Sequence, residues 1–312
     1  MSTIMSKKIE GERELEKFVF IVTKPLQILV ATAIKDQLPG DSYFVLVVID
    51  GFSLSQKVSN NIRGSELGWD SVVWGRTKAE VGSVVAKLKP TNVFIDSDIG
   101  LKNLIYLAKL KICAGLPSLF VYEEGVGTYR SDLYLGLKRT IFQVFGIGVN
   151  FGGSAFSDGI YVYDDEAYAS VDGRVSKSCT RIKKTISCIL RENLLVLERI
   201  FESRSFFESV KVKNEVCHVY LSSWKVDEAA VELLAKKDGD RYMKTHPHIK
   251  SSDYSDLNSE LVVIPSHLPA EIVLGFFVNC YKRVFVYHHG SSVCRYMPES
   301  SVLKYNLIDS ND

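Results

Sequence analysis

The chain has 312 residues, of which 46% are hydrophobic and 24% charged, a composition typical of a globular protein and not of a disordered or fibrous one. Its 38 basic and 37 acidic residues give a net charge of +1, so no overall basic field exists that would gather nucleic acid. The length exceeds the usual size of one domain, and no linker rich in Pro, Gly and Ser interrupts it. We therefore expect two closely packed domains.

Cysteine usage and polarity indicate a cytoplasmic protein. The six cysteines form neither a CxxC pair nor the spacing of a metal site, so we expect reduced thiols. The first sixteen residues are too polar for a secretory signal, and no run approaches the roughly twenty apolar residues of a spanning helix. Residues 135–149 combine apolar side chains with Lys138 and Arg139, which leaves peripheral contact with the inner face of the membrane open beside ordinary packing.

Short apolar runs alternate with longer amphipathic stretches along the first half of the chain. We predict strands at residues 18–22, 43–49, 71–74, 92–95 and 118–122, with helices between them. Buried Val/Ile/Phe runs joined by helical crossovers are typical of a parallel sheet covered on both faces. The pattern predicts an α/β domain.

A second series of the same kind follows residues 176–207, whose apolar positions recur at helical spacing. We predict strands at residues 216–221, 242–245, 261–264 and 284–287, and helices near 226–236 and 270–280. The chain then divides into a domain at 17–175, a helical connector at 176–214, a second domain at 215–300, and tails at 1–16 and 301–312. Two doubly wound, Rossmann-like domains facing across a cleft would bind a ligand at the carboxyl ends of their strands.

Polar residues that directly follow predicted strands are therefore the best site candidates. Glu123 and Glu124 come after an apolar strand and before Gly125; a carboxylate there could take a proton from a sugar hydroxyl, although solvated loop acids would give the same pattern. His246, followed by Pro247, is a candidate proton donor. At the end of a later strand, Gly290-Ser291-Ser292 could hold a phosphate, or form an ordinary turn or helix cap.

Metal ligands are not evident in the sequence. His288 and His289 are adjacent and would alternate across a strand, with no nearby carboxylate or cysteine to complete a site. Asp96-Ser97-Asp98 resembles the acidic pair of metal-dependent sugar transferases, but we interpret it as the cap of the helix that begins near Leu101.

Five segments taken in order resemble the bacterial sialyltransferases of the lipooligosaccharide and polysialic acid capsule type: Pro25-Leu26-Gln27, Glu123-Glu124-Gly125, His246-Pro247, Pro269-Ala270-Glu271 and Ser291-Ser292. Members of this family share an acidic-acidic-Gly motif, a His-Pro motif and a Ser-containing phosphate motif on a two-domain GT-B fold. The resemblance covers about residues 18–293. It implies an inverting, metal-independent transfer of sialic acid from CMP-sialic acid to a glycan hydroxyl in surface polysaccharide or lipooligosaccharide synthesis, with no cofactor.

The resemblance also implies roles for individual residues. Glu123 or Glu124 would be the general base, and His246 the acid that assists departure of cytidine monophosphate. Ser291 and Ser292 would hold the donor's phosphate and Glu271 its ribose or cytosine, and Pro247 and Gly290 would also belong to the donor site. Gln27 and Gly125 would face the cleft or the acceptor. Two alternatives remain open: a transferase for another CMP-activated ulosonic acid (Kdo, pseudaminic or legionaminic acid), and a non-catalytic glycan-binding relative.

Overall fold

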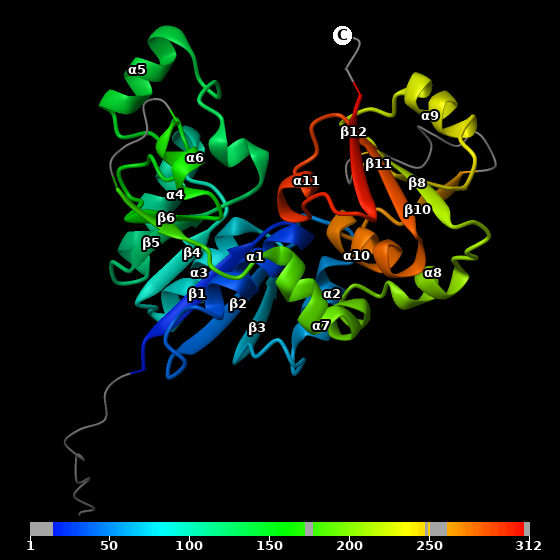
Figure 1. The fold of residues 1–312 in the computed structure, drawn as a ribbon. Helices are drawn as coiled ribbons and strands as arrows, with labels where there is room; N and C mark the ends of the chain where they lie inside the picture. The colour runs from blue at the N-terminus through cyan, green and yellow to red at the C-terminus, as the bar shows by residue number, and fades with distance from the viewer. Residues whose placement is uncertain (1–14, 172–176, 247–248, 250–260, 309–312) are drawn as a thin grey trace, which may run out of the picture.

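The computed structural model describes residues 15–171, 177–246, 249 and 261–308. Within them the chain forms two parallel sheets (Figure 1): seven strands in the order β3-β2-β1-β4-β5-β6-β7, and five in the order β10-β9-β8-β11-β12. All strand pairs within both sheets are parallel. The predicted α/β class with two Rossmann-like units is confirmed.

We refer to the first sheet and its helices as the N-terminal half. Its strands are β1 Lys17–Val22, β2 Tyr43–Ile49, β3 Ser71–Gly75, β4 Asn92–Ile95, β5 Ser118–Tyr122, β6 Gly159–Val162 and β7 Ser178–Arg181. Its helices are α1 Pro25–Lys35, α2 Ser55–Ile62, α3 Lys78–Leu88, α4 Gly100–Cys113, the 3₁₀ helix η1 Val126–Tyr129, α5 Gly136–Val144 and α6 Asp165–Ala169.

The second sheet and its helices form the C-terminal half. It contains β8 Val216–Leu221, α9 Glu228–Ala235, β9 Asp240–Lys244, β10 Val262–Ile264, α10 Ala270–Cys280, β11 Arg283–His288, α11 Val293–Tyr296 and β12 Leu303–Leu307. Two helices, α7 Ile186–Ile200 and α8 Arg204–Ser209, connect the halves.

One hydrophobic cluster runs through both halves. It includes Phe20 and Phe94 from the first sheet, Leu190 from α7, Ile272 from α10 and Val219 from the second sheet. Helix α7 contacts α1 and α2 of the N-terminal half and α10 of the C-terminal half, and it lies where the two halves meet in Figure 1. The two sheets are therefore held together by shared apolar packing in addition to the chain connection.

Three strands were not predicted: β6, which lies inside the first sheet, and the two edge strands β7 and β12. Residues 178–181 lie in the segment we expected to be helical, yet they form β7 beside β6, and residues 303–307 lie in the expected tail, yet they form β12 beside β11. Both predictions were wrong for the same reason: β7 and β12 consist mostly of exposed or half-buried residues and lack a continuous apolar run. The domain boundaries at residues 175 and 215 remain a prediction.

Phe94 lies at the centre of the first sheet, fully buried, with its ring stacked 4.3 Å from that of Phe20. We expect Phe94→Ala to lower the free energy of unfolding by about 3–5 kcal/mol because it leaves a cavity. Urea denaturation followed by circular dichroism would measure this. Phe145→Ala, at a ring that is 71% exposed, is the matched control and should change stability by no more than about 0.5 kcal/mol; equal losses would contradict the assigned core.

Candidate functional site

A cavity of about 400 Å³ lies between the two halves at the carboxyl ends of their strands. Its lining includes Lys24 and Glu124 from the N-terminal half, and Lys244, His246, Glu271 and the Ser291-Ser292 turn from the C-terminal half. This volume is within the range of small-molecule sites. The location is the one expected for doubly wound sheets, where loops after the strands converge.

The cavity brings together five of the predicted site residues: Glu124, His246, Glu271, Ser291 and Ser292. The other described candidates, Gln27, Glu123, Gly125 and Gly290, are not among its lining residues. Pro247 lies outside the described part of the chain.

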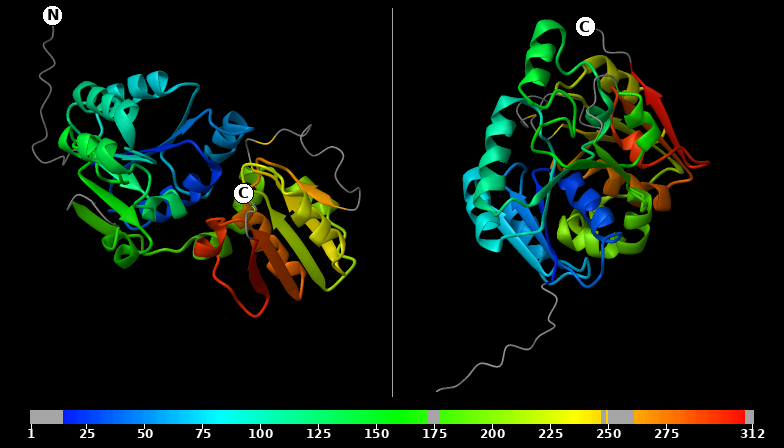
Figure 2. Two further views of the ribbon diagram at one scale, coloured as in Figure 1. Left: turned by 90° about the horizontal axis from the view of Figure 1, so that it is seen from above. Right: turned by 90° about the vertical axis from the view of Figure 1, so that its left-hand side faces the viewer.

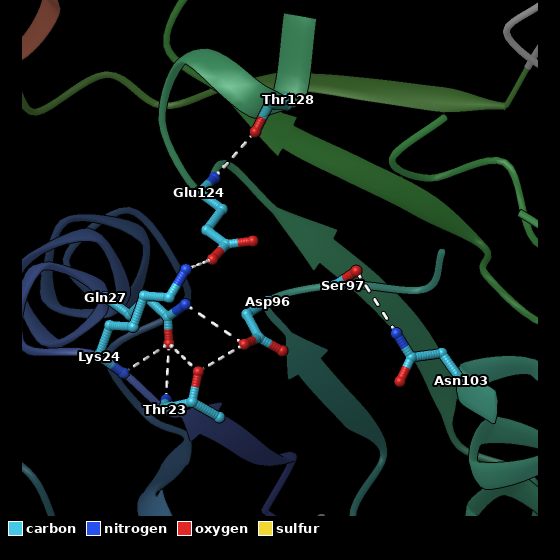
Figure 3. A network of polar contacts seen from close by, with 8 residues as sticks. All are labelled: Thr23, Lys24, Gln27, Asp96, Ser97, Asn103, Glu124 and Thr128. Atoms are coloured by element: carbon cyan, nitrogen blue, oxygen red, sulfur yellow. Dashed lines mark hydrogen bonds and ion pairs between the residues drawn. The ribbon is translucent and has the colours of Figure 1, made fainter. Parts of the chain in front are cut away.

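Glu124 is the carboxylate that faces the cavity. It forms an ion pair with the ammonium of Lys24, and its backbone N–H donates to the hydroxyl of Thr128 at 2.9 Å, as Figure 3 shows. The loop after β1 and the loop after β5 are thereby joined at the cavity wall. A carboxylate beside a cation is favoured in its ionised form, which is the form that accepts a proton.

Glu123 is buried and hydrogen-bonded within the protein and does not face the cavity. Its side chain is fully buried and accepts hydrogen bonds from the hydroxyl of Tyr129, the backbone N–H of Tyr163 at 2.7 Å and the hydroxyl of Tyr296 at 3.0 Å. Burial raises the pKa of Glu123, and these hydrogen bonds partly offset the rise. With its oxygens occupied and no share in the cavity wall, Glu123 anchors other residues, which leaves Glu124 as the candidate base.

The anchor at Glu123 connects the two halves. Tyr296 belongs to α11 of the C-terminal half, and the guanidinium of neighbouring Arg295 lies 3.8 Å from the ring centre of Tyr129. Gly125 completes the contact: its φ is +111°, and a Cβ there would lie 3.0 Å from the Cβ of Ser292. We call these contacts of Glu123, Tyr129 and Gly125 with Ser292, Arg295 and Tyr296 the Glu123 clasp. It holds the loop after β5 against the turn that carries Ser291 and Ser292.

Gln27 does not face the cleft, contrary to our expectation. It is 1% exposed, and its Oε1 accepts the backbone N–H groups of Thr23 at 2.6 Å and Lys24 at 3.1 Å. Its Nε2 donates to Asp96 at 3.3 Å, and Asp96 also accepts the hydroxyl of Thr23 at 2.6 Å (Figure 3). Gln27 therefore fixes the turn between β1 and α1, from which Lys24 reaches Glu124.

The helix-cap interpretation of Asp98 was wrong as well. Helix α4 begins after Ile99 without a side-chain cap. Asp98 is fully buried and instead accepts hydrogen bonds from the backbone N–H groups of Gly152 and Ser154 and from the hydroxyl of Ser157. Within the described residues, no group of three or more His, Cys, Asp or Glu side chains is arranged to hold a metal ion.

His246 follows β9 in the C-terminal half and lines the same cavity as Glu124. Its backbone N–H donates to the hydroxyl of Ser222 at 2.9 Å, and its ring packs 4.4 Å from that of Trp224. Trp224 also lines the cavity, and our sequence reasoning missed it. Its position shortly after β8 is the signal that could have identified it.

Lys244 is the second residue that sequence reasoning missed. It is the last residue of β9 and is 7% exposed, and its ammonium donates to the carbonyl oxygen of Ser266 at 3.2 Å. Burial lowers the pKa of Lys244 to about 8, and the nearby charge of Glu271 partly offsets this. Burial in turn raises the pKa of Glu271. A buried ammonium at a cavity wall is well suited to bind an anion.

The predicted phosphate turn follows β11. Gly290 has a φ of +71°, which turns the chain, and the backbone N–H of Ser291 donates to Nδ1 of His288 at 3.1 Å. The hydroxyl of Ser291 accepts the backbone N–H of Val293 at 3.3 Å. The turn thus presents both serines to the cavity in a fixed conformation.

Comparison with known proteins supports the fold. No family model and no curated protein sequence matches the chain. Among solved structures, the wall teichoic acid polymerase TagF, determined with CDPG, is 11% identical with a TM-score of 0.51, over 93% of this chain and 68% of that one. This likeness shows that the chain has the GT-B fold.

Two further structures have lower scores. A UDP-GlcNAc 2-epimerase from Neisseria meningitidis bound to UDP-GlcNAc is 11% identical over 88% of this chain and 77% of that one, with a TM-score of 0.48. A glycosyltransferase from Rickettsia africae is 9% identical over 96% and 86%, with a TM-score of 0.46.

The Glu123 clasp predicts a difference between two tyrosines. Tyr296→Phe removes a donor from a buried carboxylate and should lower the free energy of unfolding by about 1.5–3 kcal/mol. The ring of Tyr163 packs edge-to-face against that of Tyr296, and its own buried hydroxyl has no hydrogen-bond partner among the described residues. Tyr163→Phe should therefore be neutral or slightly stabilising. Chemical denaturation of both variants tests the clasp, and equal effects would contradict it.

The buried ammonium of Lys244 predicts pH-dependent binding of an anion. The pKa of Lys244, lowered to about 8, means that its positive charge is present below that pH and lost above it. We expect the affinity for an anion, with sulfate as the probe, to fall as pH rises from about 7 to about 9, and Lys244→Met to weaken binding roughly tenfold at pH 7 and abolish this fall. Calorimetric titration measures both effects. Lys236→Met, at an exposed lysine, is the control.

Proposed function

We propose that this protein is an inverting glycosyltransferase that moves sialic acid from CMP-sialic acid to a glycan hydroxyl without a metal ion. The observation that carries the proposal is the composition of the cavity. A carboxylate, Glu124, enters from one half, and an imidazole, His246, enters from the other together with the Ser291-Ser292 turn. Proton acceptor, proton donor and anion-binding groups thus share one space, as group transfer requires.

The anionic part of the donor is assigned to the C-terminal half. Ser291, Ser292 and Lys244 all line the cavity. Their hydroxyl and ammonium groups are suited to bind a phosphate. Glu271, at the start of α10, is the acidic group that we assign to the nucleoside. TagF, which shares the fold, was determined with CDPG, in keeping with a nucleotide-activated donor here.

In the proposed reaction the acceptor oxygen attacks the anomeric carbon of the sugar. A bond forms between these atoms while the bond from the anomeric carbon to the phosphate oxygen breaks, with inversion at carbon. Glu124 takes the proton of the acceptor hydroxyl, and His246 donates a proton to the departing phosphate. Lys244 and the serine hydroxyls stabilise the charge that develops on the leaving group.

The base assignment is tested with the adjacent pair of glutamates. Glu124→Gln should reduce transfer by roughly 10²–10⁴-fold because the amide cannot accept the proton, while cytidine monophosphate still binds. Glu123→Gln should lower thermal stability more than Glu124→Gln does, because it weakens the clasp, and it should reduce transfer less, because Glu123 is not among the residues that line the cavity. Steady-state transfer, nucleotide binding and thermal unfolding are measured on both variants. Full transfer by Glu124→Gln would refute its role.

The reaction itself is tested by incubating the purified protein with CMP-sialic acid and a panel of glycan acceptors, with and without EDTA. We expect transfer that survives the chelator and collapses in His246→Ala. Transfer only from CMP-Kdo, CMP-pseudaminic acid or CMP-legionaminic acid would show that the donor is a different CMP-activated sugar, while the proposed mechanism would still apply. Nucleotide binding without turnover of any donor would instead indicate a non-catalytic glycan-binding protein.

A further inference from the structure

Helix α5 has no buried residue, although its segment is rich in large apolar side chains. Leu135, Leu137, Val144 and Phe145 are 69%, 76%, 77% and 71% exposed, and Ile141 is 44% exposed. Helices of a folded domain normally bury their apolar stripe against the core. The apolar face of α5 is therefore not covered by the described part of the chain and is free to contact a binding partner.

Helix α4 also exposes large apolar side chains. Leu101, Ile105 and Ile112 are 51%, 61% and 74% exposed, and their spacing of four and seven residues places them on one outer stripe of α4. Leu116, just after the helix, is 71% exposed. The start of α4 adjoins the α5 segment, because a Cβ at Gly100 would lie 2.9 Å from the hydroxyl of Tyr134. Figures 1 and 2 show α5 next to α4 on the N-terminal half.

Every charged residue in the two segments that carry these side chains is a cation. Residues 99–122 and 133–157 contain no Asp or Glu and five cations: Lys102, Lys109, Lys111, Lys138 and Arg139. Lys111 is paired with Asp158 from outside these segments. Lys102, Lys109 and Lys138 are exposed, and the ammonium of Lys138 lies over the rings of Tyr134 and Phe142. The whole chain carries a net charge of only +1, so this concentration of cations is local.

We propose that the exposed faces of α4 and α5 dock on an anionic phospholipid bilayer. None of the helices in the described ranges has the length and apolar character needed to cross a membrane, so the contact is one of helices lying at the interface. Apolar side chains would enter the boundary between headgroups and acyl chains, and the lysines would contact lipid phosphates. The positive charge favours an anionic bilayer over a second copy of the chain as the binding partner, because the cations of two copies would repel each other. The inference is independent of the proposed transfer reaction.

The test is flotation with phosphatidylcholine vesicles, with or without phosphatidylglycerol. The wild-type protein should bind vesicles containing phosphatidylglycerol at least about tenfold more strongly than neutral ones, and added salt should weaken binding. Leu137→Glu/Val144→Glu should reduce binding about tenfold, and Lys138→Glu about fivefold or more. Neither variant should unfold, because both alter exposed side chains.

Leu195→Glu, at an α7 side chain that is 75% exposed, is the matched control and should bind like the wild type. Equal binding to both kinds of vesicle, or no difference between the α5 variants and this control, would overturn the proposal. A concentration-dependent dimer in sedimentation equilibrium that only the α5 variants abolish would also overturn it, because it would identify a second copy as the occupant. Circular dichroism verifies folding in every case.

Discussion

The carboxylate of Glu123 is the interaction on which the arrangement of the cavity depends. It is fully buried, and an ionised group without water must be compensated by hydrogen bonds. Two tyrosine hydroxyls and one backbone N–H supply that compensation, one of them from α11 of the opposite half. Satisfying this one charge therefore fixes the loop after β5 relative to the turn after β11, and both structures border the cavity.

The neighbouring residues gain their positions from this anchor. Glu124 follows directly and points to the cavity, where Lys24 meets it. Gly125 allows Ser292 to approach so closely that a side chain would displace it. The cavity is thus assembled by contacts between the halves and by the common core around α7. Preorganisation of this kind reduces the reorganisation that a ligand or a transition state would otherwise require.

Buried charged groups in the wall favour binding of an anion in the cavity. Lys244 and Glu271 are both almost fully buried. Burial lowers the pKa of Lys244 and raises the pKa of Glu271, which favours the neutral form of each. An anion entering the cavity would restore the charge of Lys244 and replace part of the hydration that the ammonium loses on folding. The same argument explains why a lysine is placed at the inner end of β9, where an apolar residue would pack more favourably.

Continuous apolar strands and the polar residues after them could be predicted from the sequence, since both follow from burial of a parallel sheet. The choice between Glu123 and Glu124 could not, because adjacent residues point to opposite sides and only the neighbouring loops decide which side is the cavity. Lys244 was missed because a strand lysine is ordinarily exposed. Gln27 occupies a helix N-terminal position whose amide caps the preceding turn, a local role that competes with ligand contact.

The central claim is that this cavity binds the nucleotide of an activated sugar between the two halves. A crystal structure with cytidine monophosphate tests it most directly. We predict the phosphate within hydrogen-bond distance of Ser291, Ser292 and Lys244, and the nucleoside beside Glu271. A nucleotide bound away from these residues, or a site that stays empty at saturating concentration, would contradict the account.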